Sequence, residues 1–333
     1  MDWERVWQAQ TAADRLVSSA LLPLSWLYES GWRAYLAAYQ SGLKRRRRFE
    51  IPILGVGSLE TGGLGKTPAA VAAANCLIRM GKRPAVSASG YGSPSARSAA
   101  LIRPEDAATP DRHGDEACLI RAKVPEVGLI VGRDRVRAAV LAQEAGFDAL
   151  VLDDGFQHLP LARSADLLLW NAGARNRRCL PAGPMREPAS GWRRADAIAV
   201  PEESKGGAMP SKPAFLFRRV FPGLRRVQGG ERAPLDWLRG RSVAALCAIA
   251  RPRSFFDKLE TLGARVERRV ALRDHDPLRL TLDGGIPWIV TEKDAMKLAC
   301  RGGLPADVYA LEMDIQFCDE EAFIDWLTDR LFR

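Results

Sequence analysis

Gly62-Gly63-Leu64-Gly65-Lys66-Thr67 is the stretch that decides the fold of this chain. Apolar residues at 51–56 precede it and have the pattern of a strand, and an Ala- and Leu-rich segment at 67–79 follows it with the pattern of a helix. A glycine-rich turn between a strand and a helix lets backbone N–H groups wrap around a phosphate, and the helix dipole favours the anion. The sequence therefore predicts a P-loop that binds a nucleoside triphosphate.

The whole loop is expected to contact ATP, through Glu60, Thr61, Gly62, Gly63, Leu64, Gly65, Lys66 and Thr67. Lys66 would reach the β- and γ-phosphates, and Thr67 would ligate Mg²⁺. The strict P-loop pattern has a glycine where this chain has Glu60. A carboxylate repels a polyphosphate unless a cation intervenes, so Glu60 is the residue of the loop that needs an explanation. The alternative interpretation is a glycine-rich turn with an incidental lysine.

A second motif is an apolar strand at 149–152 that ends in Asp153-Asp154. It has the form of a Walker B element, whose carboxylates hold Mg²⁺ directly or through water. The alternative is that the two acids are ordinary turn or cap residues. Gly155-Phe156-Gln157-His158 follows, and the residues alone leave open whether His158 is catalytic, structural or directed at the substrate.

Strand-like and helix-like segments alternate along the chain, which is typical of an α/β protein with a mostly parallel sheet covered on both faces. The expected strands lie at 51–56, 83–87, 128–131, 149–152, 166–170, 197–200, 214–217, 243–249, 286–290 and 308–312, and the expected helices at 67–79, 115–123, 133–145, 254–262, 293–300 and 320–331. A Pro- and Gly-rich stretch interrupts the alternation at 201–230. We therefore expect a P-loop domain at 49–230 and a smaller C-terminal α/β lobe at 231–333.

Residues 1–48 are expected to form a helical segment that contacts a membrane surface. A spanning helix needs about 20 consecutive apolar residues, but Glu29 and Arg33 interrupt the apolar run at 16–43, and Pro23 bends it. Tryptophan and tyrosine side chains in this run favour the headgroup layer, and the basic run 44–48 favours anionic lipid. The alternative is a helix packed on its own domain with a solvated basic linker.

Composition excludes several classes of protein. The six cysteines contain no CxxC pair, which argues against a zinc knuckle or a disulfide framework. The 333 residues carry a net charge of +9, which suits anionic ligands of several kinds. No RNP, KH, zinc-finger or helix-turn-helix signature is present, so a nucleic-acid partner is not expected. No protein partner is predicted either.

Taken together, the motifs resemble those of the tetraacyldisaccharide 4′-kinase family, the lipid A 4′-kinases of Gram-negative bacteria. The resemblance covers nearly the whole chain and includes two stretches specific to that family, at 153–158 (DDGFQH) and 180–187 (LPAGPMRE). Further matches lie at 57–68, 90–92, 114–116, 274–275 and 291–295.

The resemblance implies a fold of two α/β/α lobes with the active site between them. It implies transfer of the γ-phosphoryl group of ATP to the 4′-hydroxyl of a tetraacylated glucosamine disaccharide 1-phosphate, with Mg²⁺ as cofactor. It also implies work at the cytoplasmic side of the bacterial inner membrane, as a peripheral or monotopic protein.

The family's functional positions carry over onto residues of this chain. Asp115 matches the carboxylate thought to act as catalytic base, and His275 matches the histidine that pairs with it. The metal would be held by Thr67, Glu116, Asp153 and Asp154. Candidates for contact with the substrate, or for support of the site, are Gln157, His158, Arg186 and Glu187.

The chemistry is also reasonable without the family, because a sugar hydroxyl is a poor nucleophile that a nearby carboxylate can deprotonate. A competing function is a P-loop nucleotide hydrolase or switch, or a metallochaperone-like GTPase at the membrane surface. Thr291-Glu292-Lys293-Asp294 resembles a guanine-reading segment, although its spacing differs from the usual one. The chain departs from the family at Ser58, usually Asn, and at Glu60, usually Thr.

Overall fold

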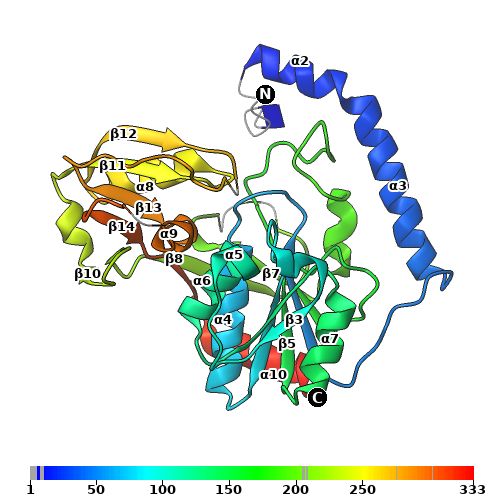
Figure 1. Ribbon diagram of the computed structural model, residues 1–333. Coiled ribbons are helices and arrows are strands. Elements are labelled where there is room, and N and C mark those ends of the chain that lie inside the picture. The colour runs from blue at the N-terminus through cyan, green and yellow to red at the C-terminus, as the bar shows by residue number, and fades with distance from the viewer. Residues whose placement is uncertain (1–5, 8–10, 205–206, 208, 275, 302) are drawn as a thin grey trace.

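The chain folds into two α/β lobes and an N-terminal helical arm, as seen in a computed structural model that describes residues 6–7, 11–204, 207, 209–274, 276–301 and 303–333 (Figure 1). The larger lobe contains a nine-stranded sheet in the order β15-β8-β7-β6-β1-β5-β2-β4-β3. Neighbouring strands from β8 through β4 pair in parallel, and only the two edge strands are antiparallel. The strands are β1 (Ile53–Ser58), β2 (Pro84–Ala88), β3 (Ala100–Ile102), β4 (Gly128–Val131), β5 (Ala149–Asp153), β6 (Ala165–Leu169), β7 (Ala197–Pro201), β8 (Ala214–Val220) and β15 (Asp314–Phe317).

Helices cover both faces of this sheet, because its strands are apolar on both sides. One face packs against α4 (Lys66–Arg79), α6 (Asp115–Lys123) and α10 (Glu320–Leu331). The other packs against α7 (Arg135–Glu144). Shorter helical turns are α5 (Pro110–His113), η1 (Pro94–Arg97), η2 (Ala189–Arg194), η3 (Glu202–Ser204) and η4 (Leu235–Leu238).

The smaller lobe contains a six-stranded sheet in the order β10-β9-β14-β13-β11-β12. Its strands are β9 (Leu224–Arg226), β10 (Arg232–Ala233), β11 (Ser242–Cys247), β12 (Arg265–Ala271), β13 (Trp288–Thr291) and β14 (Val308–Leu311). Two separate apolar clusters place α8 (Pro252–Thr261) on one face and α9 (Glu292–Ala299) on the other. The expected architecture of two α/β/α lobes is therefore confirmed.

The division of the chain between the lobes differs from the expected C-terminal lobe at 231–333. The smaller sheet already begins with β9 at Leu224, and β15 pairs with β8 at the edge of the larger sheet. The last helix, α10, follows β15, and its Phe323 and Trp326 pack against Phe215 of β8. The chain therefore crosses to the smaller lobe and returns. A strand–helix alternation cannot report this, because it carries no information about which sheet a strand joins.

The N-terminal arm consists of α2 (Ala12–Ala20) and α3 (Leu22–Gln40), which meet at Leu21. Figure 1 shows the arm running along one side of the molecule, outside both sheets. Hydroxyl groups fix it to the loop at 176–187: Ser18 Oγ donates to the carbonyl of Ala182 at 2.7 Å, and Ser25 Oγ to that of Cys179 at 2.8 Å. Within the described part of the chain, no helix is both long enough and apolar enough to cross a bilayer.

Candidate active site

The phosphate loop lies at the carboxyl end of β1, a central strand of the larger sheet. Gly62 and Gly65 have positive φ angles of 87° and 91°, which residues other than glycine rarely adopt. Gly65 is the N-cap residue of α4, and Lys66 is its first residue. The loop predicted from sequence is therefore placed as a P-loop requires, with backbone N–H groups and a helix N-terminus at one point.

Thr67 and Asp153 meet beside this loop, because β5 is the parallel neighbour of β1. Thr67 Oγ1 donates a hydrogen bond to Asp153 Oδ2 at 2.7 Å. Asp153 is 3% exposed, and its Oδ1 is buried with no hydrogen-bond partner in the described structure. Burial, together with the charge of Glu116, raises the pKa of Asp153 to about 7, and the hydrogen bond from the Thr67 hydroxyl opposes this shift.

These residues fit a magnesium ion. A buried carboxylate oxygen without a partner costs free energy that a cation would recover. The described residues contain no group of three or more His, Cys, Asp or Glu side chains arranged as a metal cage. Mg²⁺ is commonly bound by one or two carboxylates together with the phosphates of its nucleotide. When bound, the ion would neutralise charge on the transferred group, and Thr67 and Asp153 are the residues placed to hold it.

Asp154 turns its carboxylate toward cations at the loop, from a left-handed backbone conformation with φ of 57°. Arg186 donates to both of its oxygens, at 2.9 Å and 2.8 Å, and Lys66 Nζ lies 4.0 Å from Oδ2. Burial opposes ionisation of Asp154, but Lys66 and Arg186 together lower its pKa. Asp154 therefore holds the two cations in place at the mouth of the loop.

Gln157 and Glu187 support the site from below rather than line its cavity. Gln157 Nε2 donates to the carbonyl of Ser58 at 2.9 Å and to Glu187 Oε1 at 2.8 Å. Glu187 is fully buried and accepts two hydrogen bonds from Arg194 Nη2, at 2.7 Å and 2.6 Å. Both side chains are thus committed to holding the end of β1 against the 180–187 loop.

His158 has the character of a structural residue. Burial, together with the charges of Arg135 and Arg163, lowers its pKa to about 4. An imidazole with that pKa is neutral at physiological pH and is a poor general base. Arg163 Nη1 donates to the backbone carbonyl of His158 at 2.8 Å, which fixes the turn after β5.

Asp115 and Glu116 begin α6 and face α9 of the smaller lobe. Asp115 is 6% exposed, and its Oδ2 forms an ion pair with Lys297 Nζ at 3.1 Å. Lys293 Nζ lies 3.5 Å from Glu116 Oε1 and 3.3 Å from Asp274 Oδ1. The two lysines, four residues apart on α9, thus place the smaller lobe against these carboxylates. His275, predicted to pair with Asp115, lies outside the described residues.

A cavity of about 870 Å³ lies between the lobes and gathers most of the predicted site residues. Its lining from the larger lobe includes residues 61–68, Glu116, Asp153, Asp154 and Arg186. The smaller lobe contributes Arg251, Asp274 and Lys293. This cavity therefore combines a phosphate loop, carboxylates and cations from both lobes.

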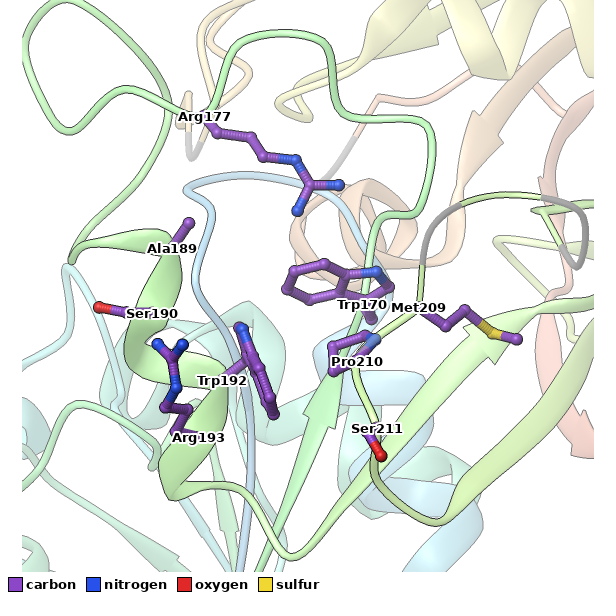
Figure 2. A pocket seen from close by; sticks show the side chains of 9 residues that line it. All are labelled: Trp170, Arg177, Ala189, Ser190, Trp192, Arg193, Met209, Pro210 and Ser211. Carbon is purple, nitrogen blue, oxygen red and sulfur yellow. The ribbon is translucent and has the colours of Figure 1, made fainter.

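A second, shallower hollow of about 420 Å³ is bounded by Trp170 and Trp192 (Figure 2). The guanidinium carbon of Arg177 lies 4.7 Å from the centre of the Trp170 ring, and Met209 and Pro210 complete the apolar wall. Its lining contains two arginines and two serines but neither carboxylate nor imidazole. Phosphoryl transfer needs metal-binding and proton-accepting groups, so the interlobe cavity is the candidate active site.

Sequence reasoning missed several residues of this site. Arg135 of α7 is buried and donates to Ser87 Oγ and to the backbone carbonyl of Asp153, each at 2.7 Å. Lys297 and Arg251 reach the site from the smaller lobe. A single basic residue in a helix or turn carries no signal of its partner, so only the fold could reveal these contacts.

The fold and the site define a P-loop phosphotransferase. A model of the Tetraacyldisaccharide-1-P 4′-kinase family matches residues 17–332, and the chain belongs to this family. The competing interpretation as a GTPase or nucleotide switch gains no support.

Relatives and a solved structure agree with this assignment. The chain is 37% identical over 331 residues to the tetraacyldisaccharide 4′-kinase of Acidovorax sp. (strain JS42), which covers 98% of this chain and 93% of the relative. It is 36% identical over 342 residues to that of Ectopseudomonas mendocina, covering 97% and 98%. The crystal structure of LpxK from Aquifex aeolicus in complex with ATP superposes with a TM-score of 0.81 at 29% identity, covering 95% of this chain and all of the other.

Proposed function

We propose that this protein transfers the γ-phosphoryl group of ATP to the 4′-hydroxyl of a tetraacylated glucosamine disaccharide 1-phosphate, at the cytoplasmic surface of the bacterial inner membrane. The observation that carries the proposal is one interlobe cavity lined by the phosphate loop, by Asp153, Asp154 and Glu116 of the larger lobe, and by Asp274 and Lys293 of the smaller lobe. Asp115 lies next to Glu116 at the start of α6, where it pairs with Lys297 of the smaller lobe.

The donor end of the reaction belongs to the phosphate loop. Its N–H groups and Lys66 would hold the triphosphate, and Thr67 with Asp153 would hold Mg²⁺. Burial lowers the pKa of Lys66, whereas the charge of Asp154 raises it. Arg135 fixes the backbone of Asp153 from behind, so the metal-binding carboxylate needs little reorganisation when the nucleotide arrives.

The acceptor end belongs to Asp115. A sugar hydroxyl placed against this carboxylate would donate its proton to it as the phosphoryl group is transferred. Asp115 Oδ1 accepts a hydrogen bond from the backbone N–H of Glu116 at 2.9 Å, and Lys297 pairs with Oδ2. These two contacts fix the orientation of the carboxylate, and His275 is proposed to act with it.

The arm supplies the proposed contact with the membrane. Leu16, Trp26 and Leu27 are 72%, 62% and 71% exposed, although their helices are hydrogen-bonded to the body of the protein. The basic side chains at 44–48 are also exposed, at the far end of α3. Exposed apolar residues beside a basic run favour an anionic lipid surface.

Asp294, which would read guanine in a GTPase, is fully buried and occupied elsewhere. Its Oδ2 accepts hydrogen bonds from the backbone N–H of Ala248 at 2.9 Å and from Thr291 Oγ1 at 2.7 Å. Asp294 therefore caps α9 and ties it to the end of β11, and its hydrogen-bonded oxygen is not offered to a base.

The test is a transfer assay with the full chain in detergent, Mg²⁺ and ATP labelled at the γ-phosphate. We expect the label in the tetraacyldisaccharide 1-phosphate acceptor, recovered as a bisphosphorylated lipid. Label released only as inorganic phosphate, with none in the lipid, would overturn the proposal in favour of a hydrolase.

A further inference from the structure

Glu60 begins the phosphate loop, and its side chain is buried, with the residue only 4% exposed. Its backbone carbonyl accepts a hydrogen bond from Arg186 Nη2 at 3.2 Å. Its carboxylate Oε2 accepts one from Asn171 Nδ2 at 3.1 Å and pairs with Arg251 Nη2, also at 3.1 Å. The negative charge of Glu60, which the sequence alone did not explain, is thus stabilised by an amide and a guanidinium.

Arg251 comes from the other lobe. It is the N-cap residue of α8, and its side chain is 34% exposed and lines the interlobe cavity. The preceding residue, Ala250, packs against the phosphate loop at Gly62. A Cβ atom added to Gly62 would lie only 3.0 Å from the Cβ of Ala250. The turn at 249–251 therefore touches the loop at two adjacent points.

The charges explain why the pair matters for nucleotide binding. A carboxylate at the first position of a phosphate loop repels a triphosphate on charge alone. Arg251 offsets this repulsion, and Glu60 holds its guanidinium at the rim of the loop. Guanidinium groups bind phosphate oxygens through two parallel N–H donors when their orientation is fixed in advance.

We propose that Glu60 is a positioning residue that presents Arg251 of the smaller lobe to the triphosphate of the bound nucleotide. The smaller lobe then contributes directly to nucleotide affinity, through a guanidinium that its partner orients. This inference rests on the proposed function only in taking ATP as the ligand.

The decisive variant is Glu60→Gln, because the two explanations of Glu60 predict opposite signs. Loss of a negative charge next to the triphosphate would by itself tighten binding. Loss of the positioning contact weakens it. We expect Glu60→Gln to weaken the binding of a non-hydrolysable ATP analogue with Mg²⁺, measured by calorimetry on the full chain. Tighter or unchanged binding would overturn the proposal.

Arg251→Met should weaken the same binding about tenfold, and KM for ATP should rise by a similar factor with kcat changed less than about threefold. The matched control is Arg253→Met, two residues further on in α8, whose guanidinium pairs with Asp257 at 3.7 Å instead. Equal affinities of the Arg251 and Arg253 variants would contradict the proposal.

A double-mutant cycle separates coupling from two independent effects. If Glu60 acts through Arg251, the Glu60→Gln/Arg251→Met variant binds the analogue no more weakly than Arg251→Met alone. Additive losses would overturn the positioning role. The calorimetry needs no lipid acceptor, so failure of lipid phosphorylation by the wild-type protein would refute the proposed function without affecting this test.

Discussion

Asp153 and Asp154 are adjacent in sequence, but their different surroundings give them different roles in the site. Burial and the charge of Glu116 raise the pKa of Asp153, whereas Lys66 and Arg186 outweigh burial and lower the pKa of Asp154. Adjacent residues thus provide one oxygen that needs a cation and one carboxylate that organises two cations. Asp115, which begins α6 beside the cavity-lining Glu116, is the third acid and the one proposed to take the proton.

The Asp153 environment predicts a dependence of stability on pH in metal-free protein. The folded pKa of about 7 lies above the unfolded value of about 3.9, so the folded state holds the proton more tightly. This contribution to stability is present at low pH and is lost as the pH rises from about 4 to about 7. In denaturant unfolding with EDTA, the free energy of unfolding of Asp153→Asn should therefore rise relative to that of the wild type across this pH range, by up to about 4 kcal/mol.

Magnesium provides the control for this prediction. Added Mg²⁺ should stabilise the wild type at pH 8 and leave Asp153→Asn nearly unchanged, because the variant lacks the ligand. A difference in the free energy of unfolding that does not vary with pH would show that Asp153 is ionised in the metal-free fold.

Asp115→Ala should lower kcat for lipid phosphorylation by about 10²- to 10⁴-fold, the usual contribution of general base catalysis. Binding of the ATP analogue should be retained, because Lys66 and Thr67 are untouched. Asp111→Ala is the matched control, since Asp111 lies in the neighbouring short helix α5 and is exposed. An equal loss of kcat in both variants would argue against a role for Asp115 as base.

At the scale of elements, the sequence predicted most helices and strands within a few residues. It placed α6 and α10 with the bounds that the structure gives, because their helical stretches and flanking residues are well marked. It missed β12, whose seven residues include four charged side chains and lie exposed at the edge of the smaller sheet. Edge strands of this kind lack the apolar pattern that identifies a buried strand.

The arm illustrates what pattern alone leaves open at this scale. A helical segment was expected here, but the hydroxyl contacts of Ser18 and Ser25 with the 176–187 loop depend on a segment more than 150 residues away. Which apolar side chains of the arm remain exposed can be told only once the structure shows which face of its helices packs on this loop.

Leu27→Ser should reduce partitioning of the full chain onto anionic vesicles by about tenfold or more, because an exposed leucine contributes about 1.5–3 kcal/mol when buried in lipid. The measurement is vesicle sedimentation. Met209→Ser is the control, as Met209 is 43% exposed and lines a hollow to which no residue of the arm contributes. Unchanged partitioning of the Leu27 variant would contradict the membrane contact.

At the scale of the whole molecule, the return of the chain to the larger sheet was not predictable from sequence. β15 and α10 complete the larger lobe after the smaller one, so the larger lobe is built from two separate segments of the chain, whereas the smaller lobe is one continuous segment from β9 to β14. Phe323 of α10 is fully buried among Phe215, Phe317 and Trp326. The larger lobe therefore depends on the last residues of the chain.

Phe323→Ala should lower the free energy of unfolding by about 3–5 kcal/mol through the cavity that it leaves. Hydrogen exchange should rise in peptides covering β8, β15 and α10 and stay low in β11 and β13. Faster exchange in β11 and β13 with no change in β8 would instead assign α10 to the smaller lobe.

A hydrogen bond connects the arm to the candidate active site. Tyr28 Oη donates to the backbone carbonyl of Arg186 at 2.6 Å, and the guanidinium of Arg186 donates to both carboxylate oxygens of Asp154. With the arm resting on a bilayer as proposed, this link sets the height of the phosphate loop above the lipid headgroups. The lipid acceptor would then reach the site by diffusion within the plane of the membrane, whereas the nucleotide reaches it by diffusion through the solution.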